Sequence, residues 1–139
     1  MAITFHFLKR TTLSKRNDLK AFLKKIAHQK GFKIETLNVV FCSDKYLLDI
    51  NKTFLKHNYF TDVITFDLSN EPQKINGEIY ISIDTVIQNA QNHHQTIKKE
   101  IHRVIFHGLL HLCGYKDKKL IDKKEMTNQE NKYLELYFS

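Results

Sequence analysis

The chain has 139 residues, 42% hydrophobic and 27% charged, a balance typical of a soluble globular protein. Its apolar runs are shorter than the roughly 20 residues of a membrane-spanning helix, and its start lacks the basic segment of a signal peptide, so we expect one cytoplasmic domain over residues 1–139. The net charge of +7 favours a polyanionic partner, RNA before membrane, although basic surface is often merely solvated.

The first half of the chain combines strand and helix patterns. Apolar periodicity predicts a strand, a helix, a strand and a helix over residues 3–8, 14–29, 33–42 and 43–55. Ser14 is a plausible N-cap of the first helix, since a serine hydroxyl can accept a free backbone N–H there, and Ser43 begins the second helix.

The second half adds two strands and three helical segments. Residues 61–66 and 77–83 predict the third and fourth strands, with a turn around Pro72 between them. Asp84 can cap a helix to about Asn92, Thr96 can cap the next, and residues 119–138 are loosely helical. Four strands that interleave with about five helices, without strict alternation, predict an α+β fold with a small mixed sheet.

The segment from His107 to Asp117, His-Gly-Leu-Leu-His-Leu-Cys-Gly-Tyr-Lys-Asp, carries the clearest functional pattern. Residues four apart on a helix share one face, so His107 and His111 can point at one metal ion. Gly114 can end the helix and let the chain turn back, so that Asp117 supplies a third ligand. Two nitrogens, one oxygen and an open fourth position are typical of a catalytic zinc site, and we expect one Zn²⁺ per chain.

Other interpretations of these residues stay open. Two histidines four apart are often a solvated pair or satisfied core residues, but this helix is strongly apolar, and unpaired buried polar groups are unfavourable. His57 is an alternative third ligand. Cys42 and Cys113 lie in apolar surroundings and are interpreted as buried thiols rather than ligands.

The stretch from His107 to Tyr115 also resembles the signature of the YbeY-type family of bacterial endoribonucleases and rRNA maturation factors. Three upstream blocks extend the resemblance. Residues 43–51 resemble a family helix that ends in Leu-Asn, residues 61–66 its Thr-Asp-Val-Leu-Ser-Phe strand, and residues 77–82 its Gly-Asp-Ile-x-Ile-Ser strand. The resemblance implies a compact α+β domain with the metal histidines on a central helix.

Two positions depart from that family pattern. The family usually has a histidine as the third metal ligand where this chain has Asp117, and an arginine where it has Leu55. Aspartate also ligates zinc. Lys56 and His57 are the cationic side chains nearest to Leu55 in the sequence.

The resemblance implies a zinc-dependent, single-strand-specific endoribonuclease that acts in 16S rRNA maturation and ribosome biogenesis. Its partners would be rRNA and the small ribosomal subunit, with neither DNA nor membrane. His107, His111 and Asp117 would hold the metal, and His107, His111 and Asp62 would form the catalytic set. Asp62 and Glu78 could orient ligands or handle protons, or could simply be polar strand or capping residues.

The sequence leaves one alternative function open and argues against two others. A non-catalytic ribosome-assembly factor, with a structural metal and basic faces that bind rRNA, is the main alternative. A zincin protease needs His-Glu-x-x-His, and position 108 is glycine, so the general base is missing. A zinc deaminase needs His-x-Glu and Pro-Cys-x-x-Cys elements, which the chain lacks.

Overall fold

The computed structural model describes residues 2–139. In this range the elements are, in chain order, β1 (Ala2–Phe7), α1 (Arg16–Gln29), β2 (Lys33–Cys42), α2 (Asp44–Leu55), β3 (Val63–Asp67), β4 (Lys74–Ser82), α3 (Ile83–Asn92), α4 (Ile97–Leu112) and α5 (Leu120–Phe138). These four strands and five helices confirm the predicted α+β fold with a small mixed sheet. None of the described helices is both long and apolar enough to cross a lipid bilayer.

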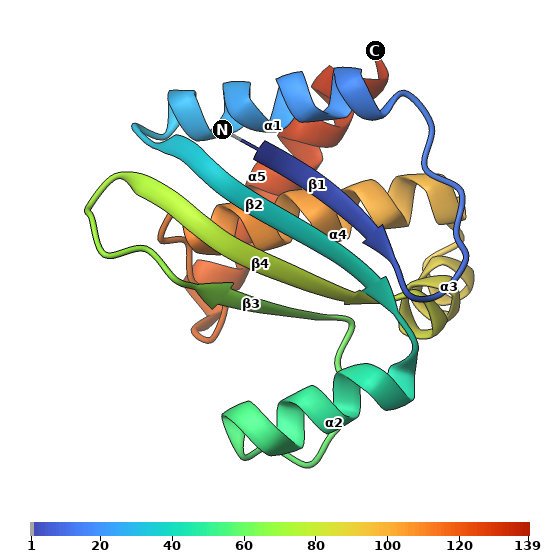
Figure 1. Cartoon of the computed structure of the whole chain (residues 1–139). Helices are drawn as coiled ribbons and strands as arrows, with labels where there is room; N and C mark the ends of the chain where they lie inside the picture. The colour runs from blue at the N-terminus through green and yellow to red at the C-terminus, as the bar shows by residue number, and fades with distance from the viewer. Residues whose placement is uncertain (1) are drawn as a thin grey trace.

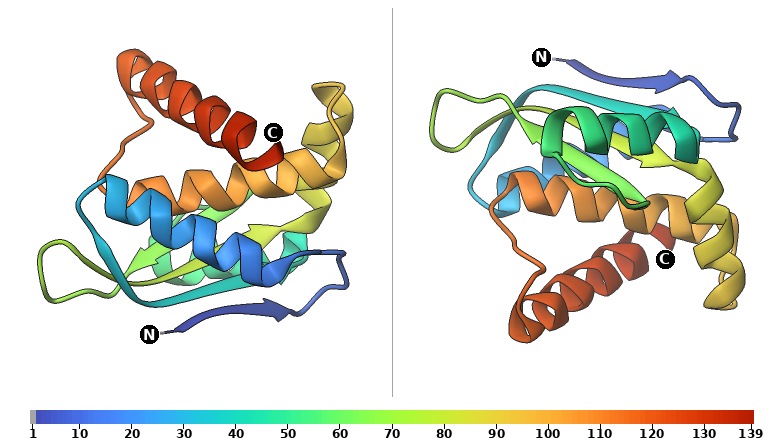
Figure 2. Two further views of the ribbon diagram at one scale, coloured as in Figure 1. Left: turned by 90° about the horizontal axis from the view of Figure 1, so that it is seen from above. Right: turned by 90° about the horizontal axis from the view of Figure 1, so that it is seen from below.

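The sheet has the strand order β1-β2-β4-β3, in which β1, β2 and β4 run parallel and β3 runs antiparallel to β4 (Figure 1). Helices α1 and α4 cover one face of the sheet, and α5 packs against α4 (Figure 2). Helix α2 lies on the other face, where Leu47 packs against Cys42 and Ile64.

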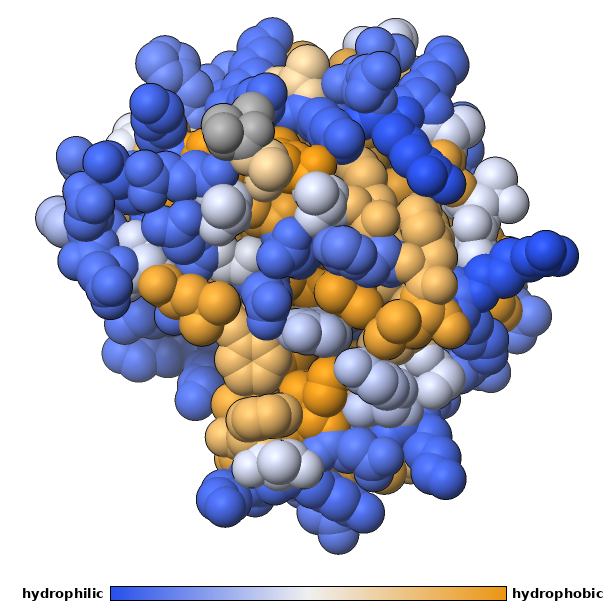
Figure 3. All heavy atoms as spheres, viewed as in Figure 1, coloured by the Kyte–Doolittle hydropathy of each residue, from blue (hydrophilic) through white to orange (hydrophobic). Residues whose placement is uncertain are grey.

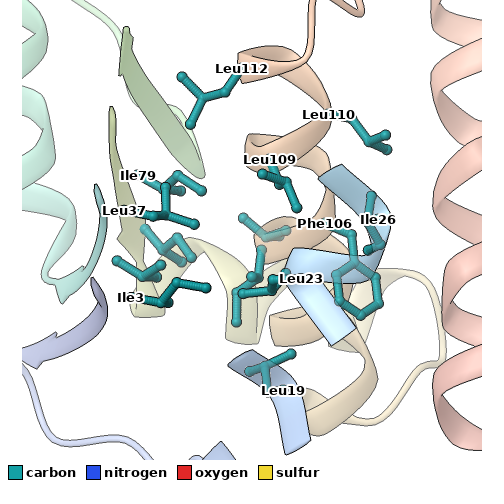
Figure 4. Packing of buried hydrophobic residues seen from close by; sticks show 14 of the residues in the cluster. Ile3, Leu19, Leu23, Ile26, Leu37, Ile79, Phe106, Leu109, Leu110 and Leu112 are labelled. Atoms are coloured by element: carbon teal, nitrogen blue, oxygen red, sulfur yellow. The ribbon is translucent and has the colours of Figure 1, made fainter. Parts of the chain in front are cut away.

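The main core lies between the sheet and helices α1 and α4. Leu109 of α4 lies between Ile79 and Leu37 of the sheet and helix α1, and Phe106 lies beside Leu23 and Ile26 of α1 (Figure 4). Ten residues of α4 are buried, so this helix is central to the core, as predicted. Its last turn is thereby held in a fixed place against β3 and β4.

Two glycines allow α4 to approach the sheet closely. A Cβ atom added to Gly108 would lie 2.7 Å from Cγ2 of Ile79, and one added to Gly77 would lie 2.8 Å from Cδ1 of Leu112. Position 108, where a zincin protease has its glutamate, therefore has no room for a longer side chain.

One of the three predicted N-caps is confirmed, because the Thr96 hydroxyl accepts the Lys99 N–H at 3.1 Å. Ser43, predicted to begin α2, is its N-cap, and its hydroxyl accepts the Tyr46 N–H at 3.2 Å. Ser14 is wrong as a cap, because α1 begins after Lys15, which is left-handed with φ 53° and makes no side-chain cap.

Asp84 is also wrong as a cap. Ser82 caps α3, and its hydroxyl accepts the Thr85 N–H at 3.3 Å. The carboxylate of Asp84 is committed elsewhere, because it pairs with Lys9 and accepts the backbone N–H of Asp44 at 2.9 Å. These partners lie far away in the sequence, so local helix chemistry could not reveal them.

The face of the sheet that carries α2 is partly open to solvent. Large hydrophobic side chains remain exposed on α2 and on the loop after it, namely Tyr46, Phe54, Leu55, Tyr59 and Phe60. Figure 3 shows this side of the molecule, where apolar side chains gather over the strands and continue towards α2 within a hydrophilic rim. The loop from α2 to β3 leads directly to the candidate site.

Candidate active site

The last turn of α4 presents two histidines on one face. The ring centroids of His107 and His111 are 4.6 Å apart. The helix ends where Gly114 adopts φ +96°, a left-handed conformation that suits glycine, and the Tyr115 N–H bonds back to the carbonyl of Leu110 at 3.0 Å. This turn carries the chain back across the end of α4, as the sequence predicts.

Asp117 returns to the same point. Its Oδ2 lies 3.1 Å from Nε2 of His111 and 3.4 Å from Nε2 of His107. One ligand atom from each of the three residues can be chosen so that all lie within 4.8 Å of one another. Around a tetrahedral ion with bonds of about 2.0–2.1 Å, ligand atoms stand about 3.3–3.4 Å apart, so this group could hold a metal ion.

The charges around His107 also suit a cation. Burial alone would lower the pKa of His107, but its hydrogen bond to Glu130 and the negative charges of Glu130, Asp62 and Asp117 raise it. Burial raises the pKa of Asp62, which the charge of His107 partly offsets. Three carboxylates therefore surround one imidazole, although the chain as a whole carries a net charge of +7.

Glu130 is a site residue that sequence reasoning missed. Its Oε2 accepts the hydrogen bond of His107 Nδ1 at 2.6 Å, although Glu130 lies 23 residues further along the chain, on α5. Glu130 is only 7% exposed. A signal was present, because Met126, Glu130, Tyr133 and Leu134 recur at helical spacing, which places an acidic residue on the buried face of α5.

A pocket of about 300 Å³ opens beside the group. Its walls include Asp62, His107, His111 and Asp117 on one side and the loop from α2 to β3 on the other, and Lys118 also lines it. The structure thus brings together His107, His111, Asp117 and Asp62, the residues expected to form the metal and catalytic sets. Leu55 also lines this pocket.

His57 lines the same pocket, but it lies outside the close group of ligand atoms found among residues 2–139. Its ring stacks on Tyr59 with centroids 5.1 Å apart, and its Nδ1 lies 3.0 Å from the Tyr59 hydroxyl. In this arrangement His57 contributes to an aromatic wall. Lys56 is the left-handed C-cap of α2 and is not among the residues that line the pocket.

Glu78 is not brought to the group. It accepts a hydrogen bond from the Tyr80 hydroxyl at 3.1 Å. Strand residues alternate between faces, and Gly77 and Ile79 face α4, so Glu78 points to the opposite side of the sheet.

The two cysteines are buried free thiols, as the sequence predicts. Burial raises the pKa of Cys42 to about 11 and that of Cys113 to about 12. Both side chains are therefore protonated at neutral pH, whereas a cysteine binds metal as the thiolate.

Comparison with known proteins identifies the family. The model of the family described as Endoribonuclease YbeY matches residues 6–137. The chain belongs to the YbeY family. This membership confirms the family predicted from the metal motif and the prediction of an enzyme of the nuclease class.

Individual relatives match over almost the whole chain. "Endoribonuclease YbeY" of Cytophaga hutchinsonii is 48% identical over 136 residues, which cover 96% of this chain and 95% of that protein. The protein of the same name from Parabacteroides distasonis is 41% identical over 120 residues, covering 86% and 84%. The solution structure of TM1509 from Thermotoga maritima superposes with a TM-score of 0.67 at 31% identity and covers 97% of this chain and 89% of that one.

Proposed function

We propose that this YbeY-family chain is a zinc-dependent, single-strand-specific endoribonuclease that acts in 16S rRNA maturation in the cytoplasm, on the small ribosomal subunit. The observation that carries the proposal is the group of His107, His111 and Asp117 at the wall of an open pocket. We further propose that residues 1–139 act as one nuclease domain. A family of endoribonucleases, enzymes that hydrolyse phosphodiester bonds, supports the reaction class.

Zinc is the metal that the donor set favours. Two imidazole nitrogens and one carboxylate oxygen are ligands that zinc accepts, and the carboxylate oxygen lies 3.1 and 3.4 Å from the two nitrogens, close to the ligand separation in a tetrahedral site. Magnesium and calcium prefer oxygen ligands alone, so the two histidines argue against them. A bound zinc ion supplies Lewis acidity towards a phosphoryl oxygen and a water of lowered pKa.

Asp62 is the residue that we assign to proton transfer. Its carboxylate lines the pocket together with the two histidines, and Asn89 Nδ2 approaches its Oδ2 at 3.5 Å. Burial raises the pKa of Asp62, and a carboxylate of raised pKa accepts a proton more readily than an ordinary one. Asp62 would take the proton that the attacking water loses.

The pocket walls suit a single RNA strand. Lys118 lines the pocket and is placed to contact phosphate by charge, and the stacked pair His57 and Tyr59 offers an aromatic surface to a base. Bases are available for such stacking only when they are unpaired, which would exclude a regular duplex. This arrangement supports the single-strand preference.

The main alternative is a non-catalytic ribosome-assembly factor with a structural metal. One observation favours it. Leu55 lines the pocket where the family motif has an arginine, so that wall lacks the expected cation. The two functions differ in whether RNA is cut, which a cleavage assay decides.

The test uses structured small-subunit rRNA and an unpaired oligonucleotide, each incubated with wild type, His111→Ala or His28→Ala. His28 is the matched control, an exposed histidine in the last turn of α1. We expect wild type and His28→Ala to cut the RNA, and His111→Ala to remain folded but inactive. Equal cutting by all three would refute metal-dependent cleavage. Binding to small-subunit particles without cutting would establish the assembly factor instead.

A further inference from the structure

Helix α5 contributes a buried carboxylate to the site. Glu130 is 7% exposed, and both of its oxygens have partners. Oε2 accepts from His107 Nδ1 at 2.6 Å, and Oε1 accepts from Arg103 Nη1 at 3.0 Å. A buried carboxylate is stable only with such partners, so its position is closely determined.

Arg103 holds Glu130 through the carboxylate oxygen that His107 does not contact. Its second guanidinium nitrogen, Nη2, donates to Oδ1 of Asn131 at 2.7 Å, so the guanidinium spans two neighbouring residues of α5. Arg103 and His107 lie four residues apart on α4 and therefore share one face of that helix. Two residues of α4, Arg103 and His107, therefore hold the Glu130 carboxylate of α5, each through a different oxygen.

The hydrogen bond between His107 and Glu130 determines which ring nitrogen of His107 keeps a lone pair that can bind a metal. An ionised carboxylate only accepts hydrogen bonds, so Nδ1 of His107 must carry the hydrogen. In a neutral imidazole the lone pair is then on Nε2, the atom that lies 3.4 Å from Oδ2 of Asp117. Glu130 and Asp117 thus contact opposite nitrogens of the same ring.

We propose that Glu130, fixed by Arg103, is a positioning residue that holds His107 with Nε2 directed at the metal. The proposal rests on the proposed function for the presence of the metal, but not for the cleavage of RNA. Carboxylates that bind the outer nitrogen of a ligating histidine orient the ring and make it a stronger ligand. The C-terminal helix is therefore part of the metal centre.

The primary test measures the zinc affinity of the folded protein by competition with a chromophoric chelator. Glu130→Gln keeps the size of the side chain and removes its charge. We expect zinc to bind about 10- to 100-fold more weakly to this variant. Glu135→Gln is the matched control, an exposed glutamate on the same helix, and its affinity should equal that of wild type.

A second readout separates positioning from general stability. In zinc-loaded wild type, the proton on Nδ1 of His107 should give a slowly exchanging imidazole signal in ¹⁵N-edited NMR spectra. Glu130→Gln should shift this signal and speed its exchange. If Glu130→Gln folds poorly because Arg103 is left without its carboxylate, the double variant Arg103→Gln/Glu130→Gln gives a neutral pair for the same two measurements.

An unchanged zinc affinity and an unchanged His107 signal in the variant would overturn the proposal. A different result would contradict the proposed function, namely that wild-type protein binds zinc tightly but does not cut RNA. That result does not affect the comparison of affinities.

Discussion

Asp117 is the most solvent-open member of the ligand group, with 38% of its side chain exposed, compared with 20% for His107 and 24% for His111. Its carboxylate makes few contacts apart from the histidines, so its main physical role is at the metal position. Replacing Asp117 should therefore affect the bound ion far more than the fold.

We predict that Asp117→Asn weakens zinc binding by about tenfold or more, because a neutral amide oxygen attracts Zn²⁺ less than a carboxylate does. The melting temperature of the metal-free protein should change little. Chelator competition and thermal unfolding measure the two effects, with Asp49→Asn, an exposed aspartate on α2, as the matched control. Zinc binding equal to that of wild type would remove Asp117 from the ligand set.

Glu100 gives a prediction about pH. It is 5% exposed on α4, and burial raises its pKa above the ordinary value, although Arg103 partly offsets this. The folded state therefore holds the proton more tightly than the unfolded state. The stability that this group contributes is complete below its ordinary pKa near 4.5 and is lost as the pH rises through the folded pKa.

Glu100→Gln should consequently melt at a higher temperature than wild type at pH 7. The difference should vanish as the pH falls below about 4, where Glu100 is protonated in both states. Thermal unfolding of the two metal-free proteins over this pH range checks the prediction. A variant that is less stable at pH 7 would mean that attraction between the Glu100 carboxylate and the nearby charge of Arg103 outweighs the effect of burial.

At the level of elements, the close contact between α4 and β4 depends on Gly108. Alanine there would gain about 1 kcal/mol of helix propensity, but its Cβ would lie 2.7 and 3.0 Å from the Cγ2 and Cδ1 atoms of Ile79. The β-branched side chain of Ile79 can move little, because its χ1 rotation is restricted. Overpacking a core costs about 1–3 kcal/mol of stability. We therefore predict that Gly108→Ala lowers the free energy of unfolding.

The sign of this effect should reverse in the Ile79→Ala background, because all three of the close atoms belong to that isoleucine. Ile79→Ala alone should cost about 2–5 kcal/mol. When Gly108→Ala is added, helix propensity should then raise the stability. Urea unfolding of the four proteins measures the coupling, and an equal cost of Gly108→Ala in both backgrounds would refute the steric explanation.

The loop between α2 and β3 carries the aromatic wall of the pocket. We predict that Tyr59→Ala weakens the binding of unpaired RNA by about 1–3 kcal/mol, the usual contribution of one stacked base. Phe54→Ala is the control, because Phe54 is 67% exposed on the neighbouring helix and does not line the pocket. Fluorescence anisotropy with a labelled oligonucleotide measures both. Equal losses of RNA affinity in the two variants would show that Tyr59 makes no specific stacking contact with RNA.

Across the whole molecule, the features that the sequence predicted correctly depend mainly on local chemistry. Strands and helices follow from side-chain periodicity, and the histidine pair follows from the helical repeat. The start of β4 at Lys74, before the predicted residue 77, depends instead on pairing with Lys33 of β2. The carboxylate of Asp84 does not cap α3 but pairs with Lys9, which lies 75 residues away in the sequence.

The candidate site shows the same division. His107, His111 and Asp117 lie within one turn and the loop after it, so spacing alone could assemble them. Glu130 reaches His107 only because α5 packs back onto α4, and nothing local to either residue indicates that contact. Tertiary packing therefore completes the metal centre that the motif begins.

The most direct test of this account is removal and return of the metal. Wild-type protein would be stripped with a chelator, checked for residual zinc by elemental analysis, and assayed on an unpaired RNA oligonucleotide before and after one equivalent of Zn²⁺ is added. We predict that the stripped protein remains folded but does not cut, and that one equivalent per chain restores cleavage. Undiminished cutting by protein shown to be free of metal would contradict the account.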